Sequence, residues 1–140
     1  MDNIIIKKIY QDSDLIELSV RAESEYIKIV QSCYVQISMI NDFASEIISF
    51  PNNYKDSLYL EFGNKLGNYT PAFSMLIASS DLCGHVKIEM DMEIDDNNMR
   101  LHRCKFYIRS ELGLIEKFGK KLRYLVLPTT EIGDEIELSE

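Results

Sequence analysis

The sequence predicts an α+β fold, in which an antiparallel β-sheet of about six to seven strands is covered on one face by two α-helices as a two-layer sandwich. Short runs of β-branched and aromatic residues, many alternating with polar ones, are typical of strands. Only two segments carry apolar residues at helical spacing. No strand–helix–strand alternation is present, so a parallel nucleotide-binding sheet is not expected.

The amino-terminal part predicts a three-stranded β-meander. Its strands are separated by short polar clusters and cover residues 4–10, 15–22 and 26–35. The apolar spacing then becomes helical over residues 38–50, with Ser38 or Asn41 as a cap and Pro51 at the end. Residues 58–62 and 73–78 follow as short strands.

A hairpin is expected over residues 85–109, with its loop at residues 96–98. In its first arm apolar residues alternate with lysine and a series of acids, so one face is apolar and the other acidic. In its second arm His102 and Cys104 share the apolar face. The predicted register places Asp91 opposite Arg103 and Glu89 opposite Lys105. It pairs acids with bases on one face of the hairpin and apolar residues with each other on the other face.

A second helix, capped by Ser110, is predicted before Pro128, because leucines and Phe118 form one apolar stripe. Residues 1–128 are therefore expected to form a single α+β domain. Residues 129–140 hold five acids and no base, whereas residues 1–128 hold 18 acids and 15 bases. The last segment is expected to be an acidic carboxy-terminal tail that carries most of the net charge.

The charge balance favours a basic partner over a nucleic acid. The chain has 15 basic and 23 acidic side chains and a formal charge of -8, which does not suit a surface that neutralises phosphates. No apolar run approaches the roughly 20 residues of a membrane-spanning helix, and no standard export signal is recognised. Three cysteines without CxxC spacing suit a reducing compartment, so a cytoplasmic protein is expected.

Catalytic and metal sites are not expected. Cys83, His85, His102 and Cys104 form the ligand set of a zinc site, but the predicted register separates the two histidines by roughly 23 Å along the strands. Asp81 and His85 resemble an acid–base pair that lacks a nucleophile, so a turn-capping role for Asp81 is favoured. The sequence shows no phosphate-binding loop, and no cofactor is predicted.

The segment from Asp81 to Met90, with Gly84 and His85 leading into a long alternating strand, carries a family resemblance. Together with Phe118 and leucines on the last helix, it resembles the pattern of WapI-like immunity proteins of bacterial polymorphic-toxin systems, over about residues 14–127. The resemblance implies a cytoplasmic antitoxin that binds a cognate toxin domain and has no catalysis of its own. It also implies that Asp81, Gly84, His85 and Phe118 are structural.

An acidic inhibitor suits a basic toxin such as a nuclease, because opposite charges steer the two together. The acids proposed to contact the partner lie in the hairpin and the tail, namely Glu89, Asp91, Glu93, Asp95, Asp96, Glu131, Asp134 and Glu135. Pairing of the hairpin acids with Arg103 and Lys105 is the simpler explanation of that pattern.

Two alternatives stay open, and the protein is expected as a monomer or homodimer. A small-molecule-binding domain or enzyme would have a pocket lined by Tyr59, Phe62, Phe73 and His85. A homo-oligomeric structural domain would pair exposed strand edges between copies.

Overall fold

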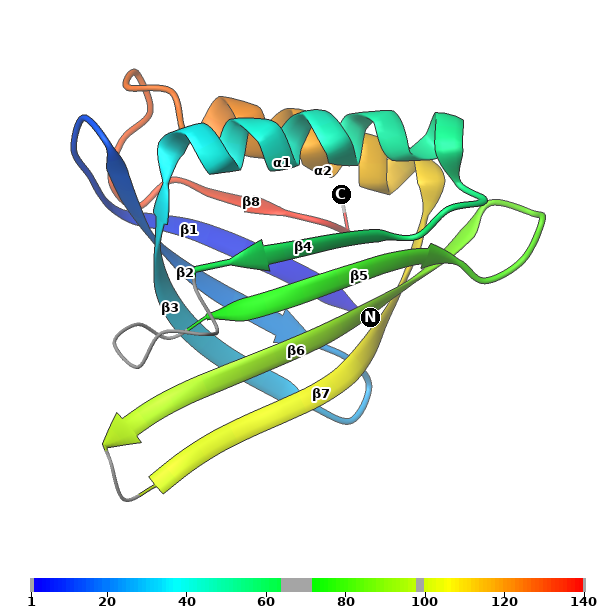
Figure 1. Ribbon diagram of the computed structural model, residues 1–140, viewed down its shortest axis with the longest axis horizontal. Helices are drawn as coiled ribbons and strands as arrows, with labels where there is room; N and C mark the ends of the chain where they lie inside the picture. Colours follow the sequence, from blue (N-terminus) through cyan, green and yellow to red (C-terminus); the bar gives the residue numbers. More distant parts are fainter. Residues whose placement is uncertain (1, 64–71, 98–99, 140) are drawn as a thin grey trace.

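The computed structural model describes residues 2–63, 72–97 and 100–139 (Figure 1). Within these ranges, residues 94–97, 100 and 101 are described by their backbone alone. The elements in chain order are β1 (Asn3–Gln11), β2 (Leu15–Glu23), β3 (Lys28–Gln36), α1 (Ile37–Ser49), the 3₁₀ helix η1 (Phe50–Asn53), β4 (Leu58–Phe62), β5 (Phe73–Ser79), β6 (His85–Asn97), β7 (Arg100–Glu111), α2 (Leu112–Leu125) and β8 (Glu135–Glu137). The predicted α+β class, with antiparallel strands and two helices, is confirmed.

The strands form two four-stranded antiparallel sheets, with the orders β3-β2-β1-β8 and β4-β5-β6-β7. Consecutive strands joined by short connections pair with each other, which is the common arrangement. α1 and η1 lie between the two meanders in the chain, so the second meander forms a sheet of its own. Local strand patterns predict the meanders but not this division.

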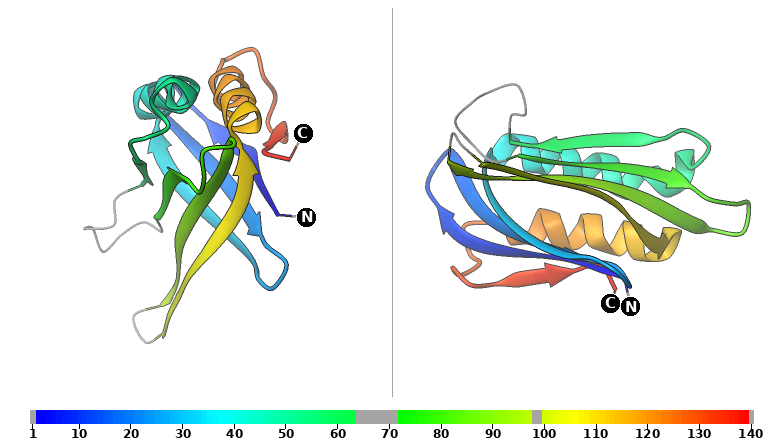
Figure 2. Two further views of the ribbon diagram at one scale, coloured as in Figure 1. Left: turned by 90° about the vertical axis from the view of Figure 1, so that its right-hand side faces the viewer. Right: turned by 90° about the horizontal axis from the view of Figure 1, so that it is seen from below.

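The two sheets face each other, and the helix pair closes one side of the space between them. In Figure 1 β4 to β7 lie in front of β1 to β3, and Figure 2 (left) shows the sheets diverging below the helices. α1 packs against α2, and both contribute buried side chains to a core that both sheets also line. Among the described residues, no helix combines the length and apolar character needed to cross a membrane.

The helices begin without the predicted side-chain caps. Gln36 and Glu111 occupy the cap positions and make no side-chain cap hydrogen bond. Each helix follows its strand directly, and its first N–H donates to a carbonyl of a neighbouring turn, from Ile37 to Asp14 O (2.9 Å) and from Leu112 to Gly84 O (3.0 Å). Carbonyls from other parts of the fold therefore accept the first N–H groups of the helices, which in many helices bond to a capping Ser or Asn side chain.

The acidic segment after Pro128 returns to the fold instead of extending as a tail. β8 pairs with β1, with Ile136 opposite Ile6, and Ile136 and Leu138 are buried in the core. The amide of Asn3 donates to the Glu137 carboxylate at 2.9 Å. Acids alternate with apolar residues here, so the segment behaves as an edge strand with its acids directed away from the core.

Candidate functional site

The turn between β5 and β6 contains the residues that carry the family resemblance. Asp81 Oδ1 accepts the N–H groups of Cys83 (2.7 Å) and His85 (3.3 Å), and Asp81 Oδ2 lies 2.6 Å from His85 Nδ1. These interactions, the Cys83 N–H first, lower the pKa of Asp81. Gly84 has φ +91°, which favours glycine. Both oxygens of the Asp81 carboxylate are therefore engaged in shaping an exposed turn.

The same turn supports the second helix. The Gly84 carbonyl accepts the first N–H of α2, and Phe118, one turn and a half further along that helix, is 1% exposed in the core. The geometry of Asp81, Gly84 and Phe118 is thus that of residues that hold β6 and α2 together.

The outer face of the second sheet carries the acids of β6. Asp91 lies opposite Lys105 and Glu93 opposite Arg103, so the predicted register is wrong by two residues. A shift of two keeps every side chain on its expected face. The expected ion pairs still form, but diagonally, because strand twist brings diagonal neighbours within reach of long side chains.

The ion pairs neutralise part of this acidic series. Arg103 donates to both oxygens of Asp91 at 3.1 and 2.8 Å, and the Lys105 amine lies 3.4 Å from Glu89. The hydrogen bond to Asp91 raises the pKa of Arg103. Glu89 also accepts the Tyr107 hydroxyl at 3.3 Å. Asp91 is only 7% exposed beside Arg103, so Glu89 and the two bases are the charges that this mixed surface presents.

The other acids predicted to contact the partner are Asp95, Asp96, Glu131, Asp134 and Glu135. Asp95 and Asp96 have side chains outside the described residues. Glu131 and Asp134 form an exposed turn, with the Glu131 N–H donating to Asp134 Oδ2 at 2.9 Å, and Glu135 lies opposite Lys7. In Figures 1 and 2 this turn lies beside the helices, far from the β6–β7 hairpin. The predicted partner-binding acids therefore occupy two separate regions.

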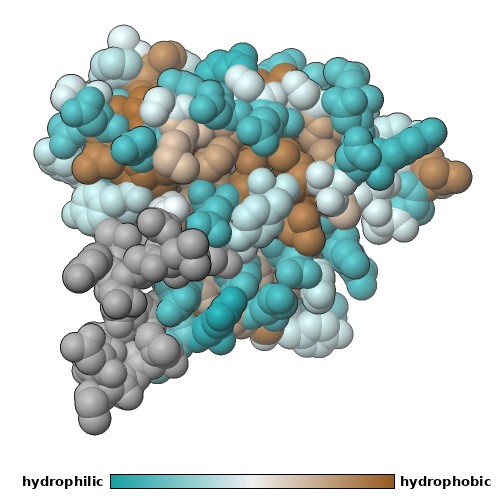
Figure 3. Space-filling model, viewed as in Figure 1, coloured by the Kyte–Doolittle hydropathy of each residue, from teal (hydrophilic) through white to brown (hydrophobic). Residues whose placement is uncertain are grey.

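Two exposed tyrosines complete the outer face. Tyr59, Leu76, Glu89 and Tyr107 lie in one row across the four strands, and the tyrosines are 53% and 48% exposed. Partial burial is the main cause that raises the pKa of Tyr59. The Lys87 amine lies 5.1 Å from the centre of the Tyr107 ring. From this side, hydrophilic residues are interspersed with small areas of hydrophobic surface (Figure 3).

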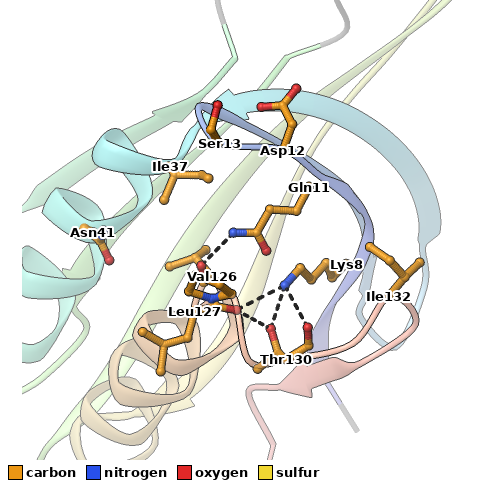
Figure 4. Close-up of a pocket in the computed structure, with 11 residues that line it drawn as sticks. Lys8, Gln11, Asp12, Ser13, Ile37, Asn41, Val126, Leu127, Thr130 and Ile132 are labelled. Carbon is orange, nitrogen blue, oxygen red and sulfur yellow. Dashed lines mark hydrogen bonds between the residues drawn. The ribbon is translucent and has the colours of Figure 1, made fainter.

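A hollow of about 530 Å³ lies between β1, the start of α1 and the end of α2 (Figure 4). Lys8 is 2% exposed there and donates to Leu127 O (3.2 Å), Thr130 O (3.3 Å) and Thr130 Oγ1 (2.6 Å). The amide of Gln11 donates to Val126 O at 2.9 Å. Since helix ends leave carbonyls without partners and favour nearby cations, Lys8 and Gln11 stabilise the end of α2.

Burial lowers the pKa of Lys8. Its ammonium donates to three oxygens, which uses the donors that a bound ligand would need. Nothing in the sequence distinguished Lys8 from Lys7, because the bulge between Lys8 and Tyr10 in the pairing of β1 with β2 is a tertiary feature.

The side chains expected to line a small-molecule pocket do not meet. Phe62 and Phe73 are fully buried and stack with ring centres 4.5 Å apart. Tyr59 lies on the opposite face of β4, and His85 lies in the exposed turn at the end of the sheet. Packed aromatic rings occupy the place proposed for a cavity.

The candidate zinc ligands are also separated. His85 lies opposite Glu111 and His102 opposite Ile94, so nine positions of β6, roughly 30 Å, separate the two histidines. His102 was expected to face the core, but its side chain is exposed because the hairpin extends beyond the body of the molecule (Figure 1). Within the described part of the chain, no three potential metal ligands cluster.

No family model matches the chain, and comparisons with curated proteins and with solved structures find no match either. The surfaces of the molecule and the resemblance of the Asp81–His85 turn are therefore the features that bear on its function.

Proposed function

We propose that the protein is a non-catalytic immunity protein that acts in the cytoplasm, where it binds and neutralises a cognate bacterial toxin domain. The resemblance around Asp81, Gly84 and His85 motivates the proposal. Since these residues support the turn and α2, the toxin would be recognised elsewhere.

The outer face of β4 to β7 is the observation that carries the proposal. Tyrosine and arginine are enriched among the residues that dominate protein–protein binding energy, and this face presents Tyr59, Tyr107 and Arg103. Strands hold these side chains in a fixed arrangement, which limits the entropy lost on binding. A rigid, mixed-polarity face of this kind suits a protein partner better than a small substrate.

Electrostatic steering would favour a basic toxin, such as a nuclease. The formal charge of -8 gives the whole molecule a negative field, and opposite charges accelerate encounter. In the proposed complex Glu89, Asp91 and Glu93, with Asp95 and Asp96, lie at the interface. The acids Glu131, Asp134 and Glu135 act from a second region, through the long-range field.

The test is capture of the partner from the native host by tagged protein at low and at high salt, with identification by mass spectrometry. We expect a toxin domain whose retention falls at high salt. Co-expression with that domain should restore growth. The double variant Tyr59→Ala/Tyr107→Ala should lose capture and protection, whereas Tyr124→Ala, which removes another tyrosine 61% exposed, should retain both. A captured domain whose toxicity is unchanged by the protein would refute the proposed function.

A further inference from the structure

The open edge of the second sheet has a defined hydrogen-bonding pattern. β7 is the last strand in the order β4-β5-β6-β7, and no strand from the described part of the chain pairs with its other side. The Arg109 N–H donates to the Asp2 carboxylate at 2.8 Å, so it points away from β6. The Leu112 N–H, of opposite parity, points toward the β6 side and donates to Gly84 O. Because backbone groups alternate along a strand, the groups of Lys105 and Tyr107 share the outward direction of Arg109.

This edge is basic although the protein is acidic. Residues 100–109 contain four of the 15 basic residues of the chain, namely Arg100, Arg103, Lys105 and Arg109, and no acid. The side chains of Lys105 and Arg109 lie on the outer face, as do those of Arg103 and Tyr107, and all four are exposed. Two of the three residues with outward backbone groups, Lys105 and Arg109, thus carry positive charge, and the Lys105 amine also lies 3.4 Å from Glu89.

A groove runs along part of the edge. It has a volume of about 500 Å³ and lies between β7 and the turn that joins β2 and β3. Ile27 and Phe106 supply its apolar lining, and Tyr26 is 85% exposed. Its charged lining comprises three bases, Lys87, Lys105 and Arg109, and two acids, Asp2 and Glu25. Figure 2 (left) shows the β2–β3 turn diverging from β7 on the side away from the helices. A segment lying beside β7 would have apolar contacts on one side and bases on the other.

The fold itself shows which pattern pairs with such strands. β6, the existing neighbour of β7, alternates apolar residues with Glu89, Asp91 and Glu93. β8 repeats the arrangement on β1, where Glu135 lies opposite Lys7 and Ile136 enters the core. In both cases an acidic and apolar alternation is added beside a strand that exposes basic side chains, several on β7 and Lys7 on β1.

We propose that the open edge of β7 binds an extended segment of a partner protein in which acidic residues alternate with apolar ones. The segment adds as a strand, its carbonyls accept the outward N–H groups of Lys105 and Tyr107, and its acids lie beside Lys105 and Arg109. Asp2 holds the Arg109 N–H in the free protein and marks an acceptor position at the groove. A second copy does not suit this edge, because antiparallel β7–β7 pairing would place bases beside bases.

The identification of this partner as a toxin rests on the proposed function, whereas the edge itself is tested without any toxin. The probe is a short synthetic peptide of alternating valine and glutamate, titrated into the ¹⁵N-labelled full chain and followed by amide chemical shifts. In the first control peptide lysine replaces each glutamate. In the second, the valines form one continuous block and the glutamates another. We expect shifts centred on Lys105, Tyr107 and Arg109 for the alternating acidic peptide alone, and weaker binding at high salt.

Variants separate the edge from general electrostatics. Lys105→Gln/Arg109→Gln should weaken binding of the peptide roughly fivefold, because two cross-strand charge pairs are lost. Lys117→Gln/Lys120→Gln removes the same charge from the exposed side of α2 and should leave the affinity unchanged. Absence of shifts at millimolar peptide, equal binding of the block peptide, or equal loss in both variants would overturn the proposal. A toxin that the protein neutralises equally well with or without Lys105→Gln/Arg109→Gln would overturn the proposed role of this edge in toxin binding while leaving the proposed function intact.

Discussion

Gly119 in α2 allows the two helices to approach closely, and replacing it tests the packing of the helix pair. A Cβ at this position would lie 2.8 Å from Ile48 Cγ1, 3.0 Å from Ile47 Cγ2 and 3.1 Å from the Ala44 carbonyl oxygen. Carbon atoms in contact prefer about 3.5–4.0 Å, so a methyl group forces the helices apart. Overpacking of this kind costs about 1–3 kcal/mol.

Gly113 in the same helix provides the matched control. A Cβ there meets nothing within 4 Å, so Gly113→Ala gains only the preference of alanine for helix, about 0.5–1 kcal/mol. Gly119→Ala has the same gain and the added overpacking cost. The difference in unfolding free energy between the two variants therefore approximates the overpacking cost alone, about 1–3 kcal/mol in favour of Gly113→Ala.

Urea unfolding followed by circular dichroism measures this difference, and it corresponds to roughly 3–10 °C in Tm for a domain of this size. Both variants should keep the native spectrum before the transition. If the Gly119→Ala variant were as stable as the Gly113→Ala variant, the overpacking argument would be refuted. Such a result would mean that α1 moves away from α2 without a loss of stability.

Three further predictions concern single side chains. Cys33 is 1% exposed and burial raises its pKa to about 12, so a thiol reagent at pH 8 should modify exposed Cys83 in the folded protein and Cys33 only on unfolding. Because the folded thiol keeps its proton between the ordinary pKa of 9.0 and about 12, stability should fall as pH rises through that interval, and less so in Cys33→Ala. Leu138→Ala should lower the free energy of unfolding by about 2–3 kcal/mol in urea titrations, and no effect would mean that residues 129–139 lie outside the cooperative unit. Asp81→Ala should lower the free energy of unfolding at neutral pH, because the ionised carboxylate stabilises the turn. When unfolding is measured at decreasing pH, the difference in stability between the variant and the native protein should vanish as pH falls through the lowered pKa of Asp81.

Local patterns in the sequence were sufficient for most elements. Composition and the polar clusters between strands located β1 and β2, alternation located β6 and β7, and helical spacing located α1 and α2 to within a few residues. These signals depend on neighbours along the chain, and burial on one face enforces them. The same locality explains the outer-face positions of Glu89 and Asp91, since their face is fixed by parity alone.

Features set by distant parts of the chain were not predictable in this way. The helix starts at Ile37 and Leu112 depend on carbonyls of remote turns, so the predicted caps, Ser38 or Asn41 and Ser110, are wrong. The hairpin register was chosen by matching charges directly opposite one another, whereas the twisted sheet matches them diagonally. Gly119 had a visible signal, a glycine within the apolar stripe of α2, that becomes informative only once α1 is known to face it.

The acidic carboxy-terminal segment shows why counting charges was misleading. Five acids without a base suggested a solvated tail, yet Ile136 and Leu138 alternate with the acids and enter the core beside β1. An edge strand with unpaired backbone groups invites association, and β8 covers part of the long β1 edge with a strand of only three residues, Glu135–Glu137. At the β7 edge of the second sheet, Lys105 and Arg109 stand beside outward N–H groups. The net charge of -8 therefore governs the encounter with a basic partner, whereas the local positive edge of β7 would select an acidic strand within that partner.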